Sequence, residues 1–346
     1  MRRKKIRIKD IARRLGYSPA TISQALNQPH TVNRSTRKEI LLLCEELGYQ
    51  KPVKSKRRTF NIAVVSGDTH NFANDFYAKV CEELLIYAKE KRYNLLFEPW
   101  KEVQDDFPWS IAKNKVDGVI SLGAIGHDKV ILIKQKNLPI VACGHPLPDV
   151  EIHTVLPDGR AGSYQATKHL IDLGHRRIAK ITGGKRFDQV AQDRVEGFRY
   201  ALTKAGIKIK EEYIINADFI NYTNVEEPLE KLFSLPHPPT AIVCASDPIA
   251  YSVYDHLTQK GYAIPQDISI TGFDDFEPPV YARPFLPKLT TVHVNVRELA
   301  RNTMDILFEL MRGPKKIAWR YTLPVGLELG ETSAGPKDRQ TLILQK

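Results

Sequence analysis

Residues 8–27 read IKDIARRLGYSPATISQALN, and this stretch decides how the N-terminal part of the chain folds. Apolar residues recur at helical spacing on both sides of Gly16, which predicts two short helices. Gly16 can end the first helix with a positive φ, and Ser18 can cap the second, which then begins with Pro19. A third helix, capped by Asn33 or Ser35, completes a helix-turn-helix. The apolar faces consist of Ile8, Ile11 and Leu15, then Ile22 and Leu26, then Ile40, Leu43 and Leu47.

The positive charge of the chain is concentrated in the same region. The 346 residues contain 51 Lys and Arg against 40 Asp and Glu, which gives a net charge of +11. Residues 1–60 alone carry +12, so the remaining residues carry −1. A basic block beside a neutral body is typical of a surface for a polyanion, although a solvated basic tail is the alternative. Together with the helix-turn-helix, the charge favours DNA binding.

The second helix, about Pro19–Asn27, is expected to enter the major groove with its N-terminal residues nearest the base edges. Thr21, Ser23 and Gln24 can hydrogen-bond to bases, and Pro19 and Ala20 can contact a thymine methyl group. The alternative for each is a solvated helix face or a cap. We expect DNA contacts from Tyr17, Ser18, Pro19, Ala20, Thr21, Ser23, Gln24, Asn27, Asn33, Lys54 and Arg57.

The composition excludes several classes of protein. With 42% apolar and 26% charged residues, the chain has enough apolar residues for a buried core and is not disordered. No apolar segment follows the basic N-terminus, and no stretch approaches the roughly 20 apolar residues of a membrane helix. The cysteines are widely separated, which predicts no disulfide framework or zinc site and favours a reducing cytoplasm. They are Cys44, Cys81, Cys143 and Cys244.

From residue 61 onward, short apolar runs alternate with amphipathic helices, which predicts a doubly wound α/β body of parallel strands. About 280 residues are too many for one sheet of this kind, so we expect two similar lobes with a cleft between them. The predicted domains are 1–49, a basic linker at 50–60, the body at 61–330 and a tail at 331–346. Strands are predicted at 62–65, 95–97, 118–122, 140–143, 178–182, 241–244 and 268–272, and helices at 75–92, 162–173, 189–205, 224–233, 248–260 and 296–311.

Polar residues gather where the predicted strands end, which is where ligands bind in such folds. Carboxylates can accept hydrogen bonds from hydroxyl groups, Arg can donate to them, and an aromatic ring can stack on a sugar face or a base. For any single Asp, a cap or turn role is the alternative. We expect a small polar effector such as a sugar, bound by residues among Asn71, Phe72, Asn74, Asp158, Arg194, Phe219, Asp247 and Asp274.

The chain resembles the lactose-repressor (LacI/GalR) family over about residues 6–330. The headpiece motifs are 8–27, VNRSTR at 32–37 and LGY at 47–49. The body motifs are LGHRRIA at 173–179, RVEGF at 194–198, PTAI at 239–242, SD at 246–247, GFDD at 272–275 and LTTV at 289–292. The resemblance implies that Asp158, Arg194, Asp274 and residue 246 bind the effector and that Phe219 stacks on it. Residue 246 is Ser where the family usually has Asn.

Two further departures concern DNA. Gln24 stands where the family usually has Arg, and Gln pairs better with adenine, so we expect A·T in the half-site. The family's hinge helix inserts paired leucines into the minor groove, but no Leu occurs between Leu47 and Leu84 here. Only Val53 could act as a small wedge. The cations of the linker could instead follow phosphates, or form a flexible tether. They are Lys54, Lys56, Arg57 and Arg58.

The sequence therefore predicts a homodimeric repressor that binds a two-fold operator and responds to a sugar held between its lobes. Alternatives are a regulator that responds to a nucleobase or a protein partner, and a sugar-binding protein without a regulatory role. No GxGxxG, GxxxxGK[ST], GxSxG or HExxH motif is present, so we expect no enzyme, cofactor or metal. The tail has no sustained Leu heptad, which predicts no tetramerisation coil.

Overall fold

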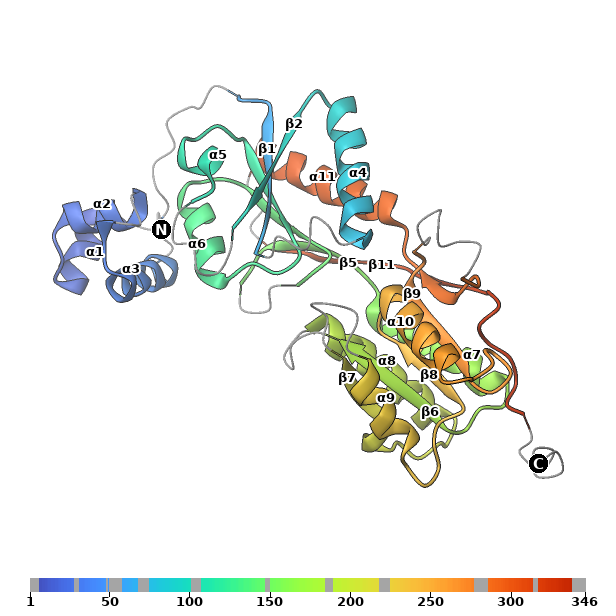
Figure 1. Cartoon of the computed structure of the whole chain (residues 1–346). Helices are drawn as coiled ribbons and strands as arrows, with labels where there is room; N and C mark the ends of the chain where they lie inside the picture. The colour runs from blue at the N-terminus through green and yellow to red at the C-terminus, as the bar shows by residue number, and fades with distance from the viewer. Residues whose placement is uncertain are drawn as a thin grey trace. The chain divides into compact units, whose positions relative to one another are not determined.

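The computed structural model in Figure 1 describes residues 6–27, 31–47, 49, 58–67, 75–100, 107–146, 150–183, 189–217, 225–276, 286–313 and 317–337. The chain forms two compact units, which we describe separately. The first unit is Met1–Leu156 with Val296–Thr322, and the second is Pro157–Asn295 with Leu323–Lys346. No helix in the described ranges is long and apolar enough to cross a membrane.

The headpiece, residues 6–49, consists of α1 (Ile8–Leu15), α2 (Pro19–Asn27) and α3 (Arg34–Glu46). Gly16 ends α1 with a φ of 71°, in the left-handed region that glycine adopts without strain. The Ser18 hydroxyl accepts a hydrogen bond from the Thr21 amide at 3.0 Å, as a cap does. The Asn33 side chain caps α3 in the same way, through the Ser35 amide at 2.9 Å. The predicted turn and both caps are confirmed.

The first lobe, the part of the first unit outside the headpiece, contains a six-stranded sheet in the order β11-β5-β4-β3-β1-β2. Strands β1 to β5 are parallel in the pairs β1–β2, β1–β3, β3–β4 and β4–β5. Helix α11 packs against α4, β3 and β4. The bounds are β1 Asn61–Ser66, α4 Asp75–Glu90, β2 Asn94–Pro99, α5 Trp109–Ala112, β3 Gly118–Leu122, α6 His127–Gln135, β4 Ile140–Cys143, β5 His153–Pro157, α11 Val296–Arg312 and β11 Arg320–Leu323.

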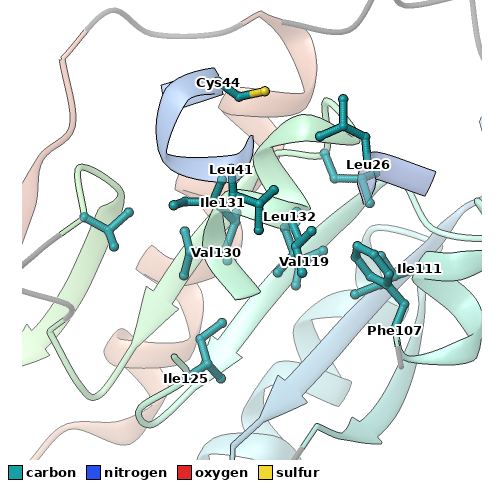
Figure 2. Close-up of a cluster of buried hydrophobic side chains, with 14 of the residues drawn as sticks. Leu26, Leu41, Cys44, Phe107, Ile111, Val119, Ile125, Val130, Ile131 and Leu132 are labelled. Carbon is teal, nitrogen blue, oxygen red and sulfur yellow. The ribbon is translucent and has the colours of Figure 1, made fainter. Parts of the chain in front are cut away.

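One buried apolar cluster of the first unit includes side chains from the headpiece and from α6, as Figure 2 shows. Leu41 of α3 is 3% exposed and belongs to the same cluster as Ile131 of α6. Glu45 lies 3.3 Å from the His127 ring nitrogen, from the same two helices. The structure thus gives α3 an apolar contact with α6 in addition to its packing inside the headpiece.

The second lobe, which is the second unit, contains a six-stranded sheet in the order β12-β10-β9-β8-β6-β7. Its strands pair in parallel, except that β12 runs antiparallel to β10. Helix α8 packs closely on α7. The bounds are α7 Gly159–Asp172, β6 Ile178–Gly183, α8 Gln189–Lys204, a 3₁₀ turn Glu211–Tyr213, β7 Ile214–Ala217, α9 Glu226–Phe233, β8 Ala241–Cys244, α10 Asp247–Gln259, β9 Ser269–Asp274, β10 Thr290–His293 and β12 Gly326–Glu328.

The predicted fold class is confirmed: each of the seven predicted strands and six predicted helices forms, with ends shifted by a few residues. The sequence reasoning gave no bounds for α5, α6 and the strands β5, β7, β10, β11 and β12. Helix α6 carries the run Val130–Ile133, all of it buried, so it shows no helical period. The antiparallel β12 corrects the expectation of an all-parallel body. The four cysteines are free.

Candidate functional site

The helix α2 presents an exposed face made largely of uncharged side chains. Pro19, Ala20 and Gln24 are exposed, and Ser23 is partly buried. None of these four carries a charge, so this face can distinguish bases by hydrogen bonding and apolar contact while neighbouring cations attract phosphate.

Other residues predicted to contact DNA already have partners inside the headpiece. The hydroxyl groups of Ser18 and Thr21 lie 2.8 Å apart, and the Tyr17 hydroxyl donates to the Glu39 carboxylate at 3.0 Å. The Asn33 side chain caps α3, as described above. Asn27 is the last residue of α2, and its side chain lies outside the described residues, as do Lys54 and Arg57.

A second group of polar side chains lies in the second lobe, where β6, β8 and β9 end. Asp158 precedes α7 and caps it, since its Oδ1 accepts from the Ala161 amide at 2.8 Å. Arg194 comes from α8, Asp247 begins α10 directly after β8 and Ser246, and Asp274 ends β9. The predicted residues Asn71, Phe72, Asn74 and Phe219 lie outside the described residues. We call the group Asp158, Arg194, Ser246, Asp247 and Asp274 the polar cluster.

Arg194 is held in place from three sides. Its Nη2 lies 3.5 Å from Oδ1 of Asp274, and its Nη1 donates to the Ala245 carbonyl. The guanidinium carbon lies 3.7 Å from the centroid of the Phe273 ring, which is stacking distance. Its Nε is buried and has no hydrogen-bond partner among the described residues. A buried donor without a partner indicates a position where a ligand oxygen could bind.

Asp247 is fully buried, and both of its carboxylate oxygens have partners. Oδ1 accepts from the Thr291 hydroxyl at 2.5 Å, and Oδ2 accepts from the Phe276 amide at 2.6 Å. A Cβ on Gly272 would lie 2.0 Å from Oδ1, so only glycine fits beside this carboxylate. Burial, and then the charge of Asp274, raises the pKa of Asp247 well above its usual range. Asp247 therefore holds the start of the loop after β9 in place through the Phe276 amide.

Asp274 has a strained backbone and a carboxyl group with a raised pKa. Its φ is 109°, in the region that side chains rarely adopt, and such strain is typical of functional sites. Burial raises its pKa from 3.8 to about 6, and the Arg194 guanidinium opposes this rise. The next residue, Asp275, lies 2.7 Å from the His293 ring nitrogen. The Asp274 carboxylate can therefore exchange its proton at mildly acidic pH.

Sequence reasoning missed Lys180 and Phe273. Lys180 is fully buried on β6, and its Nζ donates to the Cys244 carbonyl at 3.3 Å. Burial, with the charge of Arg194, lowers its pKa to about 7. The signal was present, because a lysine in the middle of an apolar strand needs a buried partner. The stacking of Phe273 depends on tertiary packing and has no counterpart in the sequence pattern.

Comparisons with known proteins find matches to both the headpiece and the body of the chain. Residues 7–51 match the lacI family of bacterial regulatory proteins, and residues 167–333 match the periplasmic binding protein-like domain. The probable HTH-type transcriptional repressor ExuR of Bacillus subtilis (strain 168) is 30% identical over 321 residues, which cover 90% of this chain and 93% of that protein. The HTH-type transcriptional repressor PurR of Vibrio vulnificus is 30% identical over 312 residues, which cover 88% and 92%.

Among solved structures, the transcriptional regulator CelR in complex with cellobiose superposes with a TM-score of 0.70 at 25% identity. The match covers 95% of this chain and all of that one. The identity to ExuR extends through the headpiece and both lobes, so it concerns the whole architecture. The chain therefore belongs to the lacI family of bacterial regulatory proteins and is a DNA-binding transcriptional repressor of that family.

Proposed function

We propose that the protein represses transcription as a homodimer on a two-fold DNA site, and that a sugar bound at the polar cluster controls its affinity for that site. It acts by binding and carries out no catalytic reaction. The four free cysteines support a reducing compartment, the cytoplasm, as its place of action.

The assignment of a sugar rests on the buried side chain of Arg194. The side chain is 8% exposed, yet its Nε has no hydrogen-bond partner among the described residues. Adjacent carboxylates at Asp158 and Asp274 can accept hydrogen bonds from hydroxyl groups, while Arg194 donates to ring or hydroxyl oxygens. Alternating donors and acceptors of this kind match a sugar, and the CelR structure contains cellobiose.

The homodimer is supported by exposed apolar side chains of the first lobe. Leu85 and Ile86 of α4 are about half exposed, at 47% and 49%, and Phe97 lies on β2, the edge strand of the sheet. Apolar surface and an open strand edge favour association with a second copy. Sedimentation velocity tests this: Leu85→Glu together with Ile86→Glu is expected to give monomers, and an unchanged sedimentation coefficient would argue against this interface.

A thermal-shift screen of sugars, nucleosides and nucleobases tests the effector class. We expect stabilisation by one or a few sugars with the wild-type protein and none with Arg194→Lys, which keeps the charge but not the planar stacking. Stabilisation by nucleobases alone would replace the sugar by a nucleobase effector. Stabilisation by no small molecule would favour a protein partner.

A further inference from the structure

The edge of the first sheet at which β1, β2 and β3 begin carries exposed cations. Each loop that enters one of these parallel strands brings one or two of them, and α11 ends beside the loops. None of these cations lies within 4 Å of an acidic side chain in the described part of the chain. We call this surface the linker edge; its cations are Arg58, Lys91, Arg92, Lys113, Lys115 and Arg312.

The loops of the linker edge contain one acidic residue among their described residues, Asp117. Its carboxylate already accepts hydrogen bonds from the end of the linker. The Asp117 carboxylate accepts hydrogen bonds from the Thr59 amide at 2.9 and 3.0 Å and from the Phe60 amide at 2.9 Å. The Thr59 hydroxyl donates to the same group at 3.0 Å. Asp117 therefore fixes the end of the linker to this edge and leaves the surrounding cations without compensation from the loops.

Three of the cations share a concave surface. Arg58, Lys91 and Arg312 line a cavity of about 400 Å³, together with Asp305 and Glu309. Asp305 accepts a hydrogen bond from the Tyr87 hydroxyl at 2.6 Å. The cations come from the linker, the end of α4 and the end of α11, so the fold gathers them from three distant parts of the sequence.

The opposite edge of the same sheet differs in charge. The described residues that follow its strands are Gly67, Trp100, 123–126 and 144–146, and none of them is Lys or Arg. Among the described loop residues, the first lobe thus has a positive end and an end without Lys or Arg. The near-neutral total charge of residues 61–346 conceals this asymmetry.

Cations at helix C-termini also complement the helix dipole, which is the simpler explanation for Lys91, Lys113 and Arg312. The position of the linker adds a second reason. Tyr49 of the headpiece and Thr59 are ten residues apart, so the chain between them spans at most about 35 Å. The headpiece therefore stays within about that distance of the point where the linker joins the lobe.

We propose that the linker edge binds phosphates of the DNA that flanks the bases contacted by α2. The contact is independent of base sequence, because it uses cations and no base-reading side chains. It gives the first lobe its own contacts with the DNA backbone. The linker of this chain lacks the leucines of a hinge helix. The partner of the linker edge is the duplex already bound by the headpiece.

The test measures how the affinity of the full-length protein for a long mixed-sequence duplex depends on salt. The variant carries Lys91→Gln, Arg92→Gln, Lys113→Gln and Lys115→Gln. Each lost phosphate contact makes the slope of log affinity against log salt shallower by about 0.9, so we expect a change of between about 1 and 4 in all. The ratio of operator to mixed-sequence affinity is expected to stay the same.

The matched control removes four exposed lysines of the second lobe, Lys168, Lys204, Lys208 and Lys260, by the same change to Gln. We expect this control to keep the wild-type slope. Equal slopes for the wild type and the linker-edge variant would overturn the proposal, as would an equal change in both variants. A lower unfolding temperature with an unchanged slope would assign the cations to the helix dipoles alone. If the wild-type protein itself does not bind DNA, the proposed function fails. If the wild type binds and only the salt slopes are equal, the contact at the linker edge fails.

Discussion

Arg194 and Phe273 form a stacked pair, with the guanidinium carbon 3.7 Å from the ring centroid. The stacking orients a planar group in which one donor, Nε, is buried without a partner among the described residues. Because Asp274 and the Ala245 carbonyl hold the other side of the group, its direction is fixed before any ligand binds. A preorganised donor loses little entropy on binding, which favours affinity for a small polar ligand.

Substitution of Arg194 is expected to affect stability as well as ligand binding. Arg194→Gln leaves the buried Asp274 carboxylate unpaired, so we expect the free energy of unfolding to fall by about 3 kcal/mol. Arg194→Lys keeps the charge and should lose less stability, but it should still lose the thermal shift caused by the sugar. Urea unfolding followed by circular dichroism measures the first effect. Equal stability of Arg194→Gln and the wild type would show that the pair with Asp274 is not energetically coupled.

Asp274 should make stability depend on pH in a defined direction. Its pKa in the folded protein is about 6, above the ordinary value of 3.8, so the folded state binds more protons than the unfolded state between these values. Stability contributed by protonated Asp274 is therefore present at low pH and lost as the pH rises from about 4 to about 6. Unfolding midpoints measured across this range should fall less steeply for Asp274→Asn than for the wild type.

Ionisation of Asp274 should also affect the ligand. An ionised carboxylate accepts stronger hydrogen bonds from hydroxyl groups, so the affinity for the sugar should rise as the pH increases through about 6 and then level off. Isothermal titration at several pH values measures this. Asp274→Asn should bind more weakly and with little pH dependence; a full wild-type pH profile in this variant would place the titrating group elsewhere.

Gln24 is expected to determine the preferred base pair at one position of each half-site. Gln24→Ala should weaken operator binding by about 1–3 kcal/mol, roughly 5- to 150-fold, while binding to mixed-sequence DNA stays the same. Gln24→Arg should shift the preference from A·T to G·C. Selection from a random duplex pool measures both, and a guanine consensus with the wild-type protein would refute the assignment.

Gly197 permits α8 to approach α7 closely. A Cβ there would lie 2.1 Å from the Arg160 carbonyl oxygen, and this oxygen belongs to the backbone and cannot rotate away. We expect Gly197→Ala to destabilise the protein by about 2–3 kcal/mol through overpacking. Gly313→Ala is the control, because a Cβ at that position meets no atom of the described residues within 4 Å. Equal unfolding midpoints for the two variants would contradict the close contact between the helices.

The sequence predicted the features that depend on local pattern or on topology. Gly16 and Ser18 specify their turn through backbone conformation and capping, which act between near neighbours. The rule that polar residues gather at the carboxyl ends of parallel strands selected Arg194 and Asp274 before their distance was known. Such rules do not predict how segments that are distant in the sequence pack against each other. The stacking of Arg194 on Phe273 and the burial of Lys180 depend on the folded lobe.

The antiparallel strand β12 and the helix α6 were missed for another reason. Strand β12 has three residues, too few for alternation to be recognised, and its direction follows from a chain that returns to the second lobe after α11. In α6 the buried run Val130–Ile133 covers a full turn, so no apolar stripe distinguishes it from a buried strand. Both elements are defined by their tertiary partners.

We propose that a sugar at the polar cluster controls operator affinity. The most direct measurement is the dissociation constant of the operator complex, by fluorescence anisotropy, with and without the sugar found in the thermal-shift screen. We predict that a saturating concentration changes the constant 5- to 150-fold for the wild type, as is typical of about 1–3 kcal/mol of coupling, and leaves it unchanged for Arg194→Lys. An operator affinity that stays constant in the wild-type protein while the sugar is bound would show that the polar cluster does not control DNA binding.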